Sequence, residues 1–73
     1  MTAEIFVRLL NEDVVVWRPV RADRLADDVY LIVDQAYDRS VETWEYEPGQ
    51  RVVCGLVEGD EGPFRAAARR VVP

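Results

Sequence analysis

The chain has 73 residues and a formal net charge of −5, from 14 acidic and 9 basic residues, and it contains no histidine. A chain of this length forms one small domain and buries only about 60% of the surface that it exposes when unfolded, so most of its large apolar side chains are needed for folding. The acidic balance disfavours nucleic acids and anionic membranes as partners, because phosphate groups repel such a chain unless its arginines cluster. We therefore expect a single domain over residues 1–73.

The single cysteine, Cys54, cannot form a disulfide within the chain, and this is typical of a reducing compartment. The chain does not begin with a basic segment followed by an apolar one, as a secretory signal does. Its uninterrupted apolar runs are far shorter than the roughly 18 residues of a membrane-spanning helix. We expect a cytoplasmic protein without a membrane partner.

The first predicted strand covers residues 3–10. Ile5, Val7 and Leu9 recur at every second position and share one face, which is the spacing of a strand with one buried face. Residues 11–13, with the sequence NED, favour a turn and therefore a hairpin with the next strand.

The second predicted strand covers residues 14–18, with Pro19 at its bent end, because proline has no N–H for a strand ladder. Residues 21–28 are polar and predict a helical turn or an irregular loop. Leu25 is the one large apolar residue of that segment, and we expect it to fill the core. Trp17 is expected to pack under the same loop.

Three further strands are predicted from alternating apolar residues, over residues 29–34, 41–47 and 50–59. The dipeptide Pro48–Gly49 is a strong turn signal between the last two of these strands. Gly55 is the candidate for a β-bulge or a close packing point in the last of them.

The tail, residues 64–72, fits either a short helix or a closing strand. We favour the strand, because so short a helix is marginal by itself and because Phe64, Ala66 and Ala68 alternate with other residues. Five or six short strands in a chain of this length predict an all-β protein, a small SH3-like (Tudor- or KOW-like) antiparallel barrel whose closure removes exposed strand edges. A five-stranded oligonucleotide-binding barrel is the alternative and usually needs a longer chain.

Several motifs carry a resemblance to known proteins. The elements VRLL, VWRPV and WEYEPGQRVVC, within residues 4–54, resemble the signature of a group of small bacterial proteins of unassigned function. This resemblance implies a small all-β, SH3-like fold and brings no catalytic or binding residue with it. The element PGQRVV is similar to the Pro-Gly turn and apolar strand of Tudor and KOW modules, and it supports the fold alone.

Catalytic and metal chemistry have few residues to draw on in this sequence. Without histidine and with one cysteine, a transition-metal site lacks its usual ligands. Cys54 has no histidine to ionise it, and its apolar strand suits a buried thiol. We therefore expect no enzyme activity, no metal and no cofactor.

Aromatic and arginine side chains are the remaining candidates for a binding site. Trp44 and Tyr46 fit structural cover and a contact surface equally well, and Tyr37, in a polar turn, is the aromatic expected to be exposed. We expect a small interaction or regulatory module that binds another protein through them. The alternative is a Tudor- or KOW-like nucleic-acid-binding module that uses Arg18, Arg21 and the aromatic side chains.

Overall fold

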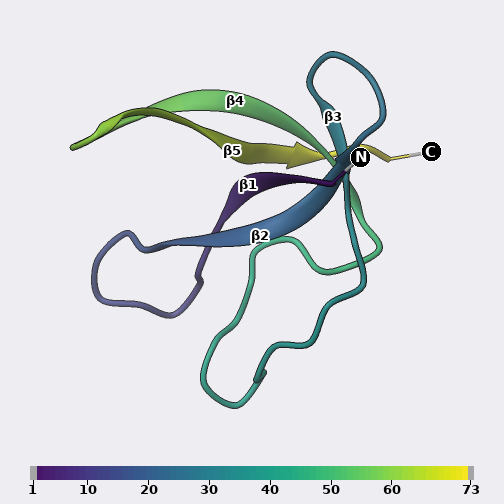
Figure 1. Ribbon diagram of the computed structural model, residues 1–73. Coiled ribbons are helices and arrows are strands. Elements are labelled where there is room, and N and C mark those ends of the chain that lie inside the picture. Colours follow the sequence, from purple (N-terminus) through teal and green to yellow (C-terminus); the bar gives the residue numbers. More distant parts are fainter. Residues whose placement is uncertain (1, 73) are drawn as a thin grey trace.

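The computed structural model describes residues 2–72 and contains strands but no helix in that range (Figure 1). The strands are β1 (Thr2–Arg8), β2 (Trp17–Arg24), β3 (Val29–Ile32), β4 (Arg51–Gly59) and β5 (Gly62–Arg70). Each strand pairs with the next one in an antiparallel manner, and β5 returns beside β1, where the two are parallel. The result is a closed five-stranded barrel, consistent with the predicted SH3-like fold, although its closing pair is parallel.

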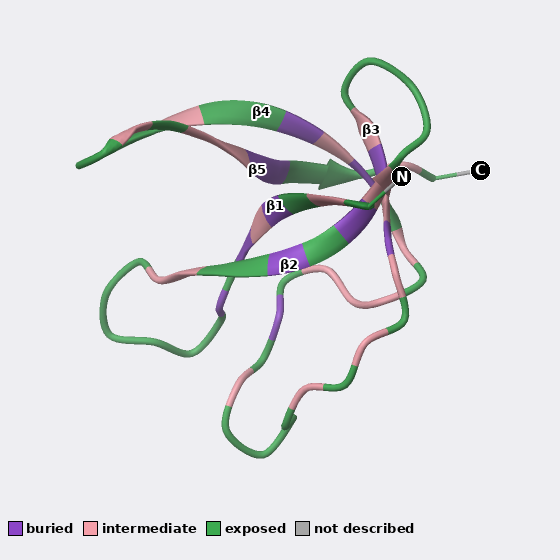
Figure 2. Ribbon diagram, in the orientation of Figure 1, coloured by how far each residue is buried: buried purple, intermediate pink, exposed green. Residues whose placement is uncertain are grey.

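The core lies inside this barrel, and along β1 to β4 its apolar side chains occur at alternate positions (Figure 2). Strand β1 begins the pattern, since Ile5 and Val7 are fully buried while the residues between and beside them are not. The remaining strands contribute the other buried side chains, which are Val20, Ala22, Tyr30, Ile32, Val52, Cys54, Ala66 and Ala67. The predicted first strand and its inward face are thus confirmed, with an end at Arg8 instead of Leu10.

The second strand lies further along the chain than residues 14–18, so that prediction is wrong. Val14 and Val15 belong to a loop. Just before β2, the carbonyl oxygen of Val16 accepts a hydrogen bond from the N–H of Leu9 at 2.9 Å. Strand β2 starts only at Trp17, opposite Arg8. The β-branched residues have the propensity for a strand, but β1 ends before it could pair with them.

Pro19 lies inside β2, opposite Phe6, and not at a bent end of the strand. The backbone N–H and carbonyl groups of successive residues point alternately towards and away from the neighbouring strand. Because the carbonyl of Val16 points towards β1, where it accepts from Leu9, the backbone nitrogen of Pro19 points away from β1. Strand β3 reaches only Ala22–Arg24 of β2, and no described strand lies beside Pro19 on that side. The missing N–H therefore leaves no ladder bond unmade.

Residues 21–28, predicted as a loop or helical turn, form a strand in their first half and a turn in their second half. Residues 21–24 complete β2, and Ala22 faces the core between charged neighbours. Leu25 then opens the turn to β3 and donates its N–H to the carbonyl oxygen of Val29 at 2.8 Å. Its side chain is 48% exposed, so the prediction that Leu25 fills the core is wrong.

The predicted strand over residues 41–47 does not form. This segment lies in the long loop between β3 and β4, and its one strand-like contact is an isolated bridge between Trp44 and Leu9. Two hydrogen bonds flank the bridge, from Leu10 N–H to the Thr43 carbonyl at 2.7 Å and from Glu45 N–H to the Arg8 carbonyl at 2.9 Å. Only the end of β1 faces the segment, and one bridge is too little pairing for a strand.

The third strand is also shorter than predicted and ends at Ile32 instead of residue 34. Beyond it, the side chain of Gln35 takes the place of a strand partner for Arg21 of β2. Its Oε1 accepts from the Arg21 N–H at 3.1 Å, and its Nε2 donates to the Arg21 carbonyl at 2.9 Å. The Arg21 carbonyl also accepts from the Val33 N–H at 3.2 Å, so the side-chain amide of Gln35 is the partner of the Arg21 N–H and a second donor to its carbonyl.

From Pro48 onward the structure follows the predictions closely. The turn at Pro48–Gly49 forms, with Gly49 at a φ of 91°, and β4 and the closing strand β5 are present. The register irregularity lies between Val53 and Cys54, next to the predicted position at Gly55 but not at it. It adds one residue to β5, so that Ala66 and Ala67 are both buried.

Trp17 packs against the closing strand and not under residues 21–28, so that prediction is wrong. Its ring lies 5.5 Å from the ring of Phe64, measured between centroids, and Phe64 lies 4.9 Å from Phe6. Both pairs are edge-to-face, which is a favourable geometry for aromatic rings. The three half-buried rings join β1, β2 and β5 near the point where the barrel closes.

Candidate protein-binding surface

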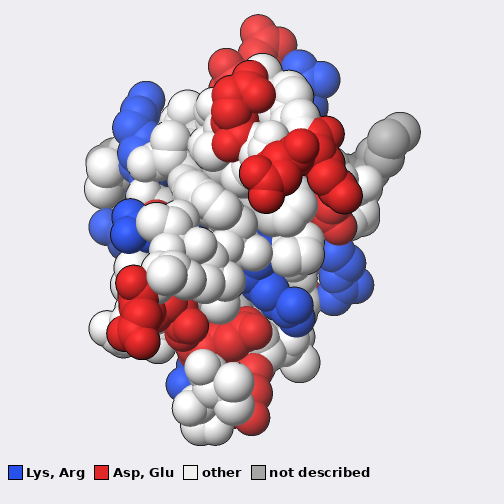
Figure 3. Space-filling view, turned by 90° about the vertical axis from the view of Figure 1, so that its left-hand side faces the viewer, with Lys and Arg blue, Asp and Glu red and all other residues white. Residues whose placement is uncertain are grey.

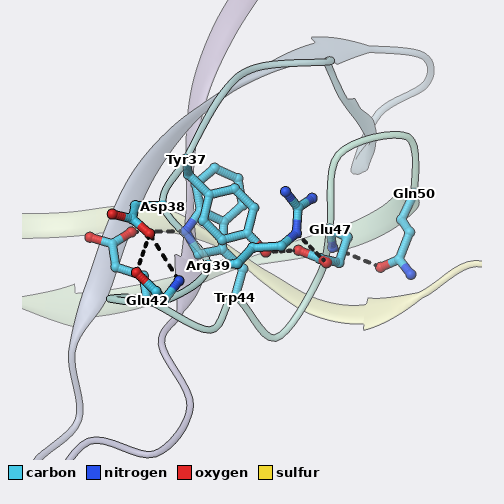
Figure 4. Close-up of polar contacts among 8 residues, drawn as sticks. Tyr37, Asp38, Arg39, Glu42, Trp44, Glu47 and Gln50 are labelled. Carbon is cyan, nitrogen blue, oxygen red and sulfur yellow. Dashed lines mark hydrogen bonds and ion pairs between the residues drawn. The ribbon is translucent and has the colours of Figure 1, made fainter.

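A three-layer stack stands in the long loop between β3 and β4 (Figure 4). The ring of Trp44, which is 4% exposed, belongs to the core, and the ring of Tyr37 lies parallel to it at 4.0 Å between centroids and 12° between planes. The guanidinium carbon of Arg39 lies 4.4 Å from the Tyr37 centroid, within the range of a cation–π contact. The core thus continues outward through Trp44 and Tyr37 to a charged, exposed layer.

Two glutamates hold the polar atoms of this stack. Glu47 accepts a hydrogen bond from the Tyr37 hydroxyl, and its Oε1 lies 3.4 Å from Nε of Arg39. Glu42 accepts from Nε1 of Trp44 at 3.0 Å. Burial, together with the hydrogen bond to Glu47, raises the pKa of Tyr37, so its hydroxyl remains a donor at neutral pH.

The backbone of the same loop is fixed at both ends of the stack. The Asp38 carboxylate accepts from the Ser40 hydroxyl at 2.5 Å and from the Ser40 backbone N–H at 2.9 Å, which makes a tight turn. The hydroxyl's hydrogen bond, and then the backbone one, lower the pKa of Asp38. At the other end, the Glu47 N–H donates to Oε1 of Gln50 at 2.9 Å. The loop therefore presents its side chains from a hydrogen-bonded frame.

Exposed apolar side chains lie on this loop and on the loop between β1 and β2. Val14 and Val15, in the loop between β1 and β2, are 72% and 60% exposed, and Val41 is 71% exposed. Leu10, which is 38% exposed, links the two loops, because its N–H donates to the Thr43 carbonyl at 2.7 Å. Both loops leave the lower side of the barrel in Figure 1. We refer to Leu10, Val14, Val15 and Val41, with Tyr37 and Arg39, as the loop surface.

The structure brings three of the five predicted site residues together. Tyr37 and Trp44 stack, and Arg18 joins them through Glu42, whose Oε1 lies 3.5 Å from the Arg18 Nε. Trp44 is buried and supports the surface from below, while Tyr37, predicted to be exposed, is half-buried.

The other two predicted site residues lie apart from the stack. Tyr46 packs against the core, donates its hydroxyl to the Ala68 carbonyl at 3.1 Å and has a pKa raised by burial. Arg21 is exposed on β2, beside Gln35. Sequence reasoning missed the exposed valines, because a run of three β-branched residues is the usual signal of a strand.

Cys54 is a buried thiol on β4, as its sequence context predicted. Its N–H donates to the Asp28 carbonyl at 2.7 Å. Burial raises the pKa of the thiol from 9.0 to about 11, with a smaller opposing effect from Arg65. At neutral pH the group is therefore a protonated, apolar core side chain and not a nucleophile.

This burial predicts a loss of stability at alkaline pH. The unfolded thiol ionises near 9.0 and the folded one near 11, so the neutral thiol favours the folded state fully below pH 9 and the benefit is lost between pH 9 and 11. The free energy of unfolding should fall by on the order of 1 kcal/mol between pH 7.5 and pH 10. Urea titrations at the two pH values measure it. Cys54→Ala should show a smaller fall, and an unchanged fall in this variant would contradict the assignment.

No metal site or membrane-spanning helix can be assigned within residues 2–72. Histidine, cysteine and acidic side chains do not form any group of three that could hold a metal ion there. None of the described residues belongs to a helix long and apolar enough to cross a membrane. On the face drawn in Figure 3, acidic side chains gather towards the top and the lower end, and uncharged surface with several basic side chains lies between them. Comparison of the chain with known protein families, with curated proteins and with solved structures finds no match.

Proposed function

We propose that this protein is a small interaction or regulatory module that binds another protein through the loop surface. The observation that carries the proposal is the exposure of Val14, Val15 and Val41 on loops that hydrogen bonds and the Tyr37–Trp44 stack hold in place. Exposed apolar patches typically mark binding sites on soluble domains, and the hydrogen bond from Leu10 to Thr43 joins the two loops that carry these valines. A preformed surface also loses less conformational entropy on binding than a mobile one.

The chemistry of the surface favours a protein partner. The loop surface combines apolar valines with an aromatic ring and an arginine, and aromatic and arginine side chains are enriched at the centres of protein interfaces. The acidic residues of the same loops, including Glu12, Asp13 and Asp38, would repel a phosphate backbone. The resemblance to small bacterial proteins and the cytoplasmic location remain predictions that agree with this role.

The proposal is tested by a double variant, Val15→Asp with Val41→Asp, which places two charges on the loop surface. Both side chains are exposed, so the fold should remain intact. Wild-type and variant protein are coupled to beads and incubated with cytoplasmic extract of the source cell, and the retained proteins are quantified by mass spectrometry. We expect at least one protein to be retained by the wild type and reduced about tenfold or more by the variant, because apolar contacts at an interface centre carry most of the binding energy.

Leu25→Asp is the matched control, because Leu25 is also exposed and apolar but lies in the turn between β2 and β3. It should retain the same partner as the wild type. Equal loss in both variants would show non-specific adhesion, and equal retention in both would place the interface elsewhere; either result would contradict the proposal.

A nucleic-acid-binding module is the second candidate, and the arrangement of the arginines favours it. The ion pairs between described residues engage Arg18, Arg24, Arg39 and Arg65. Arg51 and Arg70 instead line an open cleft of about 410 Å³. Arg69 precedes Arg70 on β5, where it pairs with Val53 of β4. Recovery of RNA or DNA on the beads, with binding that weakens steeply with salt and with Arg51→Glu or Arg21→Glu, would favour this candidate.

A further inference from the structure

Strand β4 extends well beyond the strand that pairs with it on its outer side. Strand β3 pairs with β4 only from Arg51 to Val53. The last contact on this side is the hydrogen bond from the Cys54 N–H to the carbonyl of Asp28, the residue just before β3. Strand β5 accompanies β4 on its other side as far as the turn at Gly59. Figure 1 shows this pair projecting from the barrel as a two-stranded ribbon. The outer edge of β4 from Gly55 to Gly59 therefore has no strand beside it among residues 2–72.

The hydrogen bonds show which backbone groups face this free edge. Gln50 accepts from Ile32 of β3, and Cys54 donates to Asp28, so the even-numbered positions of β4 face outward. Arg51, an odd-numbered position, accepts from Val71 on the β5 side. Because the direction alternates along a strand, the N–H and carbonyl groups of Leu56 and Glu58 also face outward. None of these groups has a backbone partner in another described element.

The side chains at this edge leave it open to a partner. Leu56 is 69% exposed, and the glycines on either side, Gly55 and Gly59, add no bulk. The outer edge of β5 is protected from pairing with another chain by Pro63, which lies opposite Glu58 and has no N–H to donate. Glu58 is the one charged residue on the free part of β4, and it hinders aggregation without covering the backbone.

The charged residues at the two ends of the free edge of β4 favour a partner strand of a particular charge. Asp28 lies at one end of the free edge, where its side chain is 66% exposed, and Asp60 and Glu61 form the hairpin turn at the other end. Arg65 offsets part of the charge of Asp28, at 3.8 Å. An extended segment with an apolar centre and a basic residue at each end would match this pattern. A second copy of this chain, paired antiparallel, would instead bring its Asp60 beside Asp28.

We infer that the edge of β4 over Leu56–Glu58 is a docking site for an extended, basic peptide segment, which adds to the sheet as a further strand. Backbone hydrogen bonds to Leu56 and Glu58 would supply the affinity, and the acidic residues at both ends would select basic sequences. This site is separate from the loop surface, and it does not depend on the function proposed for that surface.

The test uses the full chain labelled with nitrogen-15 and a capped peptide of sequence Arg-Val-Thr-Val-Arg. On titration, we expect the amide signals of Leu56 and Glu58 to shift downfield and their hydrogen exchange to slow, because both groups gain a partner. The peptide Glu-Val-Thr-Val-Glu should bind about tenfold more weakly or not at all, because it places like charges together. The loop variant Val15→Asp with Val41→Asp should bind the basic peptide as the wild type does, so the two proposals fail separately.

Leu56→Pro is the variant that addresses the mechanism. Proline removes the outward N–H, which β5 does not use, and should weaken the basic peptide about tenfold or more. Leu56→Thr keeps the N–H and should retain binding. If Leu56→Pro does not fold, the basic peptide methylated on its backbone nitrogens replaces it and should fail to bind the wild type.

Three results would overturn the inference. The first is the absence of shifts at residues 55–59 with the basic peptide. The second is binding that survives Leu56→Pro or backbone methylation of the peptide. The third is a shift at the same residues that depends on protein concentration alone, since it would assign the edge to a second copy of this chain.

Discussion

Replacing Trp44 by alanine should destabilise the protein by about 3–5 kcal/mol, the largest effect expected of any single side chain here. Trp44 is almost fully buried although it lies in a loop, and it contacts the core on one side and the ring of Tyr37 on the other. Its removal would open a cavity under the loop surface and leave Glu42 without the indole N–H. A small domain has roughly 5 kcal/mol of stability to lose, so the variant should be largely unfolded at 37 °C.

Urea unfolding followed by the fluorescence of Trp17, the remaining tryptophan, measures this loss. Trp44→Phe keeps a ring on Tyr37 and should remain folded with a smaller loss, which gives a readout if the alanine variant does not fold. Leu25→Ala is the control, because sequence reasoning placed Leu25 in the core and the structure places it outside. It should change stability by about 0.5 kcal/mol or less. Equal losses for Trp44→Ala and Leu25→Ala would contradict the structure of both segments.

Replacing Ile32 by alanine should cost about 2–5 kcal/mol. The side chain is completely buried at the end of β3, where its backbone also bonds to Gln50 and Gly49 before β4. It therefore fills the part of the core where β3 and the long loop meet. Chemical unfolding in urea or guanidinium gives the loss of free energy.

Leu31 provides the matched control on the same strand. It points to the other face and is half-buried, opposite Asp23 on one side and Arg51 on the other. Leu31→Ala should therefore cost about 1 kcal/mol or less. If Leu31→Ala were the more damaging of the two substitutions, the inward and outward faces of β3 would be reversed.

Two of the failed strand predictions have the same cause. Residues 14–18 and 41–47 both have the composition and alternation of strands, and both lie largely in loops. A strand needs a neighbouring backbone over several residues, and β1 ends at Arg8, so neither segment finds one. Residues 21–24 show the reverse case, because they are highly polar yet pair with both β1 and β3.

The candidate site was only partly predictable for the same reason. Three of its aromatic and arginine residues, Tyr37, Trp44 and Arg18, were chosen by residue type. Their grouping depends on Glu42 and Glu47, which the sequence presents as ordinary surface charges. The exposure of Val14 and Val15 follows from the loop that contains them, and local sequence favours a strand at that position.

By itself the sequence determined the all-β class, the inward face of β1, the turn at Pro48–Gly49 and the buried state of Cys54. These properties depend on local alternation, on turn residues and on the transfer of apolar side chains from water. Only the tertiary structure decided where β2 begins, that Trp44 enters the core from a loop, and that one edge of β4 stays free. These depend on which backbone lies beside which, and pairing between distant segments is a property of the closed barrel as a whole.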